Sequence, residues 1–155
     1  MLNTLRKLTK LPLLLVIFLV LLMYIVDVLN LVDSYAFVYQ SIIAFTLFIV
    51  GLLVIVVSGI LFRKAKTTVN PMNPEKATQL VNTGLYQYSR NPMYLGFFTW
   101  LLAFVILIGN PINILILPLY VLLANKLYIF PEEKALEQLF EKEFITYKNN
   151  VKRWI

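Results

Sequence analysis

The sequence predicts an all-α fold: a polytopic membrane helix bundle of about four transmembrane helices, with a tight C-terminal helical hairpin and a cytoplasmic amphipathic C-terminal helix. The 155 residues are 60% hydrophobic and only 14% charged, against about 25% charged in a typical soluble domain. So little polar surface is insufficient to cover a soluble globule. Long uncharged segments and a one-sided distribution of Lys and Arg support the same prediction.

Three apolar segments account for the four predicted spans. The first covers residues 11–31, with Asp27 as its one charged residue, and the second covers 34–62 without a charged residue. The third, residues 91–125, is also uncharged and contains Gly109-Asn110-Pro111, a tripeptide typical of turns. Because a helix needs about 20 apolar residues to cross a bilayer, this turn predicts two antiparallel arms, 92–108 and 112–130.

The positive charges predict the orientation of the bundle. All 14 Lys and Arg residues lie before the first apolar segment, between the second and third, or from Lys126 onward. Cytoplasmic segments retain such residues, so both termini are predicted to be cytoplasmic. This topology, together with attraction to anionic lipid, explains the net charge of +6 without nucleic acid as a partner.

The tail, residues 131–155, is predicted to form the amphipathic helix. Proline followed by two acidic residues, Glu132 and Glu133, is typical of a helix start. Apolar residues then recur at helical spacing, at Leu136, Leu139, Phe140, Phe144, Tyr147 and Val151. The helix is expected to lie on the membrane or to cap the bundle. Residues 1–62 are thus predicted to form an N-terminal helix pair, and 63–155 a loop, hairpin and tail in one unit.

Two counts of zero restrict the chemistry. The chain has no His and no Cys, which excludes disulfides, imidazole or thiolate metal sites, and Cys-His or Ser-His-Asp nucleophilic catalysis. No metal site is therefore predicted. Carboxylates, Arg, Lys, Tyr, amides and the backbone remain for any reaction.

Polar and aromatic residues gather where the third predicted span enters the membrane. The string Leu85-Tyr86-Gln87-Tyr88-Ser89-Arg90-Asn91-Pro92-Met93-Tyr94-Leu95-Gly96 is followed, after the hairpin, by Glu132-Glu133. An interfacial aromatic belt with a snorkelling Arg explains each residue singly. A functional site explains why Arg90 and the two carboxylates approach the same membrane face from adjacent hairpin arms. The residues alone leave both explanations open.

From about residue 67 to 153 the sequence resembles the superfamily of isoprenylcysteine carboxyl methyltransferases and phospholipid methyltransferases, which are integral-membrane enzymes that use S-adenosylmethionine. The resemblance rests on the motifs Leu80-Val81-x-x-Gly84-x-Tyr86, Arg90 to Gly96, Gly109-Asn110-Pro111, Glu132-Glu133-x-x-Leu136, Phe140, and Tyr147 with Val151 and Arg153. Their order and spacing match those of the family. The first two spans match only in being apolar.

The resemblance implies roles for particular residues. The predicted cofactor-binding residues are Pro71, Thr78, Gln79, Leu80, Val81, Tyr86, Asn91, Pro92, Met93, Tyr94 and Glu132. The predicted catalytic residues are Arg90, Glu132 and Glu133, and the predicted substrate residues are Arg90, Tyr128 and Arg153. Many family members have His where this chain has Asn91, and the prenylcysteine enzymes have a substrate-associated Arg where it has Tyr128. An acid–base role at Asn91 is therefore not expected, because an amide does not titrate.

The implied reaction is methyl transfer from S-adenosylmethionine to a lipophilic small-molecule substrate, with S-adenosylhomocysteine as product. Such a displacement depends on positioning and on exclusion of water, so it needs neither His nor Cys. Membrane lipids are expected neighbours, and the sequence indicates neither nucleic acid nor an obligate protein partner. The alternatives are a small multi-span transporter or interaction subunit, and an NADPH-dependent membrane reductase.

Overall fold

The computed structural model describes residues 12–65 and 78–155. Within these ranges the regular elements are all helices, joined by loops and turns. Its elements, in chain order, are α2 (Pro12–Val28), α3 (Gln40–Lys64), η2 (Gly84–Gln87), α4 (Pro92–Ile108), η3 (Pro111–Leu115), α5 (Ile116–Ala124), η4 (Asn125–Ile129) and α6 (Phe130–Asn150). The predicted all-α class is confirmed. The first three predicted apolar runs contain α2, α3 and α4, whereas the fourth, 112–130, is divided among η3, α5 and η4.

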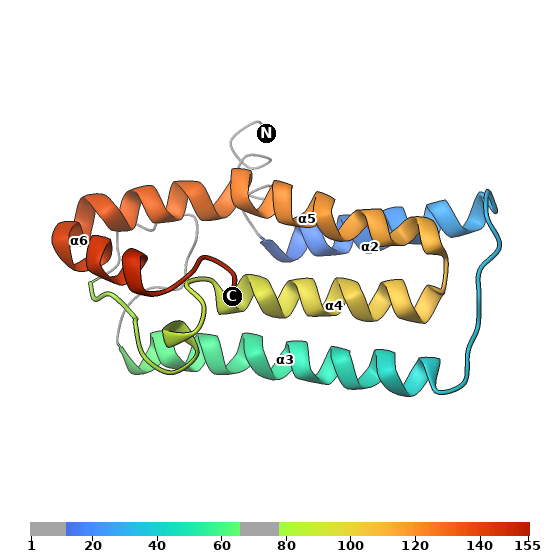
Figure 1. Cartoon of the computed structure of the whole chain (residues 1–155), viewed down its shortest axis with the longest axis horizontal. Helices are drawn as coiled ribbons and strands as arrows, with labels where there is room; N and C mark the ends of the chain where they lie inside the picture. The colour runs from blue at the N-terminus through green and yellow to red at the C-terminus, as the bar shows by residue number, and fades with distance from the viewer. Residues whose placement is uncertain (1–11, 66–77) are drawn as a thin grey trace.

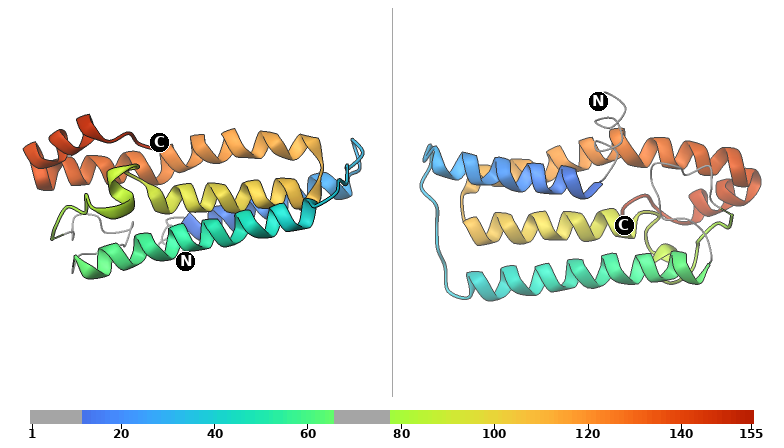
Figure 2. Two further views of the ribbon diagram at one scale, coloured as in Figure 1. Left: turned by 60° about the horizontal axis from the view of Figure 1, so that its bottom comes forward. Right: turned by 180° about the vertical axis from the view of Figure 1, so that it is seen from behind.

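The long helices lie side by side in alternating directions (Figure 1). In all views α4 lies between α3 and α5, and α2 packs against both α4 and α5 (Figure 2). The turn after α4 and the loop between α2 and α3 lie at one end of the bundle, whereas η2, α6 and the C-terminus lie toward the other. The structure therefore brings the start of α4 and the start of α6 to the same end.

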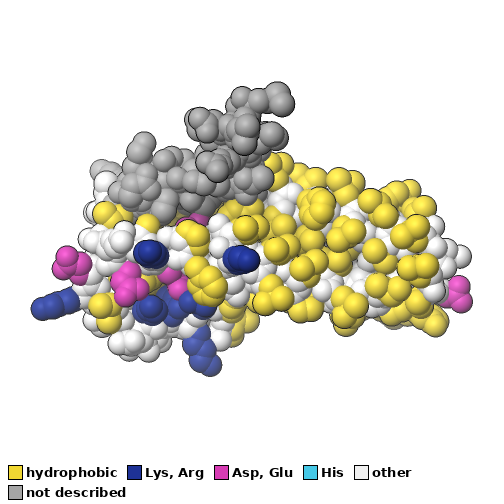
Figure 3. Space-filling model, turned by 90° about the horizontal axis from the view of Figure 1, so that it is seen from above, with side chains coloured by type: hydrophobic (Ala, Val, Ile, Leu, Met, Phe, Trp, Pro, Cys, Tyr) yellow, Lys and Arg dark blue, Asp and Glu magenta, His cyan; other side chains and the backbone are white. Residues whose placement is uncertain are grey.

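Among the described residues, two helical stretches are long and apolar enough to cross a membrane, Gln40–Lys64 and the continuous run Pro111–Asn150, and the apolar helices α2 and α4 are shorter. Figure 3 shows hydrophobic side chains predominating over one half of the visible face, with charged side chains gathered mainly over the other half. Many large hydrophobic side chains of α2 and α3 are exposed, including Phe18, Leu21, Ile42 and Phe45. A bundle whose outward surface is apolar is suited to lipid rather than to water.

Two glycines let α3 and α4 approach closely. A Cβ added at Gly51 would lie 2.8 Å from the carbonyl oxygen of Gly96, and one added at Gly96 would lie 2.8 Å from that of Gly51. Beside them, Trp100 donates a 2.9 Å hydrogen bond to the carbonyl oxygen of Phe48. Small residues at a helix crossing allow such backbone contact in a membrane bundle.

The tail differs from the prediction of a separate, single amphipathic helix. Helix α6 follows α5 without a loop, through the π-helical segment η4. A π-helical turn just before Pro131 relieves the usual conflict between a proline ring and the preceding turn. At Glu141 the backbone leaves the helical region (φ 39°, ψ −112°), and the chain turns back toward the bundle (Figure 1). The tail is therefore a bent pair of helical arms, here called the first and second arm of α6.

Candidate functional site

The predicted polar residues meet where the start of α4 faces the start of α6. Arg90 immediately precedes α4, and its guanidinium lies against the carboxylate of Glu133 in the first turn of α6. The Nη2 atom of Arg90 is 2.8 Å from Oε1 of Glu133, and both side chains are 9% exposed. The structure thus confirms that Arg90 and one glutamate of the pair lie together.

Arg90 also forms hydrogen bonds with the end of α6. Its Nη1 atom donates to the carbonyl oxygens of Lys148, at 3.0 Å, and Val151, at 2.6 Å. Its Nε atom donates to Glu133 at 3.1 Å. The last carbonyls of a helix have no partner within the helix, so Arg90 caps the second arm of α6 while it pairs with the first.

A second arginine reaches the same carboxylate from the C-terminal segment. Arg153 donates from Nε to Oε1 of Glu133 at 3.1 Å and from Nη2 to Oε2 at 2.6 Å, while its guanidinium lies 4.6 Å from the ring centre of Phe130. Burial alone would raise the pKa of Glu133, but hydrogen bonds and charge from both guanidinium groups outweigh it and hold that pKa below its usual range. Glu133 is therefore a carboxylate that stays ionised between two cations.

Backbone and amide contacts also fix the C-terminal segment against the residues before α4. The amide of Arg90 donates to the carbonyl oxygen of Lys152 at 2.9 Å. The side chains of Ser89 and Asn91 donate to the carbonyl oxygen of Arg153 at 3.3 and 3.1 Å. Ser89 and Asn91 are buried, so these polar groups find their partners in the tail.

Glu132 turns away from this cluster and binds Tyr94 on α4. The Tyr94 hydroxyl donates a 2.7 Å hydrogen bond to Oε1 of Glu132, and its ring stacks on Tyr128 with the centroids 6.0 Å apart. The carbonyl oxygen of Tyr94 accepts a 2.9 Å bond from Tyr120. Burial raises the pKa of Glu132 to about 7, although the bond from Tyr94 lowers it. Glu132 therefore titrates near neutral pH, unlike its neighbour.

A second cluster joins η2 and the segment before it to α6. Val81 and Tyr86 pack with Phe144 and Tyr147 of the second arm, and Tyr147 donates a 2.6 Å hydrogen bond to the carbonyl oxygen of Tyr86. The pKa of Tyr86 lies above its usual range because the ring is buried, even though a side-chain bond to Ser58 lowers it. Ser58 is fully buried in α3. This cluster fastens the loop to the bundle close to Arg90.

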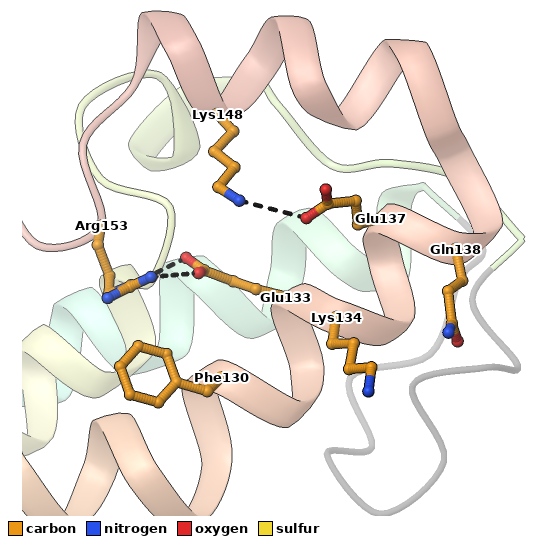
Figure 4. Close-up of a pocket in the computed structure, with 7 residues that line it drawn as sticks. All are labelled: Phe130, Glu133, Lys134, Glu137, Gln138, Lys148 and Arg153. Carbon is orange, nitrogen blue, oxygen red and sulfur yellow. Dashed lines mark hydrogen bonds and ion pairs between the residues drawn. The ribbon is translucent and has the colours of Figure 1, made fainter.

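A cavity of about 460 Å³ opens beside the ion pairs, between the two arms of α6 and the C-terminal segment. Figure 4 shows Arg153 and Glu133 on one side of it and the Lys148–Glu137 pair on another. The latter pair, with a nitrogen–oxygen distance of 3.2 Å, is 40% and 44% exposed. The remaining residues that line the cavity are Phe130, Lys134 and Gln138.

The other predicted site residues are spread over the same end of the molecule. Pro92 is buried at the start of α4, and Met93 packs against the main core. Leu80 packs against the second cluster, whereas Thr78 and Gln79 are exposed. Pro71 lies outside the described residues. Ser58, Ser89 and Tyr120 were not predicted as site residues from the sequence. For Ser58 the available signal was a hydroxyl within an uncharged span.

The model of the phospholipid methyltransferase family matches residues 39–143, which is more than half of the chain and includes Arg90, Tyr94 and both glutamates. The chain belongs to the phospholipid methyltransferase family. No solved structure matches it significantly.

Curated relatives match a shorter segment. The chain is 42% identical over 74 residues to a protein-S-isoprenylcysteine O-methyltransferase of Saccharomyces cerevisiae, which covers 46% of this chain and 30% of that protein. It is 36% identical over 72 residues to one of Dictyostelium discoideum, with the same two shares. An uncharacterized protein of Haemophilus influenzae is 36% identical over 63 residues, covering 41% of this chain and 100% of that protein. The match thus spans less than a third of the two methyltransferases.

Proposed function

We propose that this protein is an S-adenosylmethionine-dependent integral-membrane methyltransferase that acts on a lipophilic substrate at the cytoplasmic membrane face. The observation that carries the proposal is the family match over residues 39–143. The structure adds that a carboxylate and stacked tyrosines meet where apolar helices end. Two named relatives are protein-S-isoprenylcysteine O-methyltransferases.

The side chains near Tyr94 fit the functional groups of S-adenosylmethionine. That molecule carries an amine and ribose hydroxyls, which donate hydrogen bonds, and a sulfonium, which favours aromatic faces. Oε1 of Glu132 is occupied by Tyr94, and Oε2 accepts no hydrogen bond from the described residues. Glu132, Tyr94 and Tyr128 would therefore hold the cofactor, with Asn91, Met93 and the residues 78–81 around it.

When bound, S-adenosylmethionine supplies an electrophilic methyl group. The side chains of the protein orient the cofactor and the substrate, exclude water and, for an amine substrate, accept a proton. Tyr94 and Tyr120 are buried, so water is excluded along α4 and α5. Glu132 is the proposed proton acceptor when the substrate is an ammonium, because its pKa of about 7 lets it exchange a proton near neutral pH.

Topology supports entry of the substrate from the bilayer. We infer four spans, formed by α2, α3, α4 and the run from η3 to η4, with both termini cytoplasmic. The Lys and Arg side chains visible in Figure 3 lie over the half of the molecule that carries α6, in keeping with the one-sided distribution of Lys and Arg along the sequence. A lipophilic substrate in the cytoplasmic leaflet would then approach Tyr128 and Phe130 directly from the membrane.

The substrate class can be tested by labelling. Membranes containing the protein are incubated with S-adenosylmethionine labelled in its methyl group, and the lipid-soluble product is treated with alkali. An isoprenylcysteine-like carboxylate gives a methyl ester that releases labelled methanol, whereas a phospholipid-like amine gives an alkali-stable N-methyl group. Membranes with the Glu132→Gln variant serve as control. Equal labelling by both proteins would contradict the proposal.

A further inference from the structure

Arg90 makes its polar contacts inside the protein. A guanidinium has five N–H donors, and the structure directs Arg90 in four hydrogen bonds to Glu133, Lys148 and Val151. The side chain is 9% exposed. A carboxylate of a cofactor or substrate would have to displace these partners, so direct ligand binding by Arg90 is disfavoured by the geometry.

The same residues hold the end of the chain. Ser89, Arg90 and Asn91 bind the carbonyl oxygens of residues 148, 151, 152 and 153, and Trp154 packs edge-on against Tyr120 at 6.3 Å. We call the set Ser89–Asn91, Glu133 and Val151–Trp154 the C-terminal clamp. It joins the start of α4, the first arm of α6 and the last residues of the chain.

The clamp is adjacent to Glu132, whose carboxylate is proposed to bind the cofactor. Arg90 and Tyr94 are four residues apart and bind the consecutive residues Glu133 and Glu132. Because neighbouring helical residues point about 100° apart, one side of α6 meets the clamp and the other meets Tyr94. A shift of α6 along α4 would therefore disturb both contacts together.

We propose that Arg90, Glu133 and Arg153 are positioning residues: they lock the C-terminal segment Val151–Trp154 onto the start of α4 and thereby hold Glu132 against Tyr94. The positioning role rests on the proposed cofactor site, whereas the locking of the tail does not. Removing one partner of a buried ion pair leaves an uncompensated charge, so loss of Glu133 would open the clamp by repulsion between Arg90 and Arg153.

The first experiment measures release of the C-terminal segment. The full chain in lipid nanodiscs is exposed to trypsin, and cleavage after Lys152 and Arg153 is followed by mass spectrometry. Because cleavage follows the population of the open form, we expect it to be about tenfold faster in Glu133→Gln and in the milder variant Arg90→Lys. Glu137→Gln is the matched control, since it breaks the exposed Lys148–Glu137 pair between the same two arms. Unchanged cleavage in both clamp variants would overturn the proposal.

The second experiment measures affinity for S-adenosylhomocysteine and, separately, the values of KM and kcat. We expect both clamp variants to lose affinity for S-adenosylhomocysteine, by about tenfold for Glu133→Gln, and Glu137→Gln to keep it. If the tail is released and affinity is unchanged, the positioning role is wrong. If only the KM of the lipid substrate rises while the tail stays protected, Arg90 binds substrate and the proposal is also wrong. If the wild type binds no S-adenosylhomocysteine, the proposed function and the positioning role both fail, and trypsin alone decides whether the tail is locked.

Discussion

At the scale of single residues, the two neighbouring glutamates are held in opposite states. Glu133 lies between two arginines, which keep its pKa low, whereas burial raises the pKa of Glu132 to about 7. The sequence predicted that Arg90 and the glutamate pair would meet, because they end adjacent arms of a hairpin. It could not predict which glutamate faces the arginines, since that depends on the rotation of α6 relative to α4.

Replacing Glu132 by Gln is expected to raise stability while lowering cofactor affinity. The pKa of Glu132 is raised from 4.5 to about 7, so the folded protein holds this proton more tightly than the unfolded chain and stability falls as pH rises through that window. Glu132→Gln mimics the protonated form. At about pH 8 the variant should be more stable by about 1–2 kcal/mol after allowance for solvent screening, and at about pH 4 equally stable. Thermal unfolding across pH checks this; a less stable variant at the higher pH would contradict it.

Replacing Tyr94 by Phe should move the titration of Glu132. The hydrogen bond from Tyr94 lowers the pKa of Glu132, so its loss raises that pKa further. If ionised Glu132 binds the cofactor, the pH midpoint of S-adenosylhomocysteine binding should rise by about half to one unit. Tyr120→Phe is the control, because it removes a bond to the Tyr94 carbonyl and leaves the Glu132 contact. A midpoint that moves equally in both variants would refute this explanation.

At the scale of the elements, the hydrophobic pattern was sufficient for the helices but not for their junctions. The turn at Gly109-Asn110-Pro111 appears where it was predicted, and Gly109 has a φ of 75° that favours glycine. The bend of α6 was missed because Glu141 takes a φ of 39° without a glycine or proline to mark it. The Gly51–Gly96 contact was also missed, since the two glycines lie on different helices.

The close approach of α3 and α4 predicts that Gly96→Ala destabilises the bundle. The added Cβ would lie 2.6 Å from Cγ1 of Ile55 and 2.8 Å from the carbonyl oxygen of Gly51, so the helices must separate. We expect a cost of about 1–3 kcal/mol. Gly59→Ala meets nothing within 4 Å and should be neutral or stabilising by up to about 1 kcal/mol. Thermal unfolding of both variants in detergent measures the difference, and an equal response would show that α3 and α4 do not touch here.

At the scale of the whole molecule, the proposed four-span topology places the site at the cytoplasmic face. The chain has no Cys, so single cysteines report accessibility without background. Val38, 75% exposed between α2 and α3, should be labelled as Val38→Cys in intact cells by a membrane-impermeant maleimide. Asn149→Cys, in the second arm of α6, should be labelled only after permeabilisation. Labelling of both in intact cells would place the site outside.

The central claim is that the site built from Glu132 and Tyr94 binds S-adenosylmethionine. Calorimetric titration of the purified protein in detergent tests it most directly, with S-adenosylmethionine, S-adenosylhomocysteine and NADPH as separate ligands. We expect saturable binding of the first two ligands and no binding of NADPH. In Glu132→Gln the affinity should fall by about tenfold or more, the loss that removing a charged hydrogen-bond partner produces. Binding of NADPH alone, or of none of the three ligands, would contradict it.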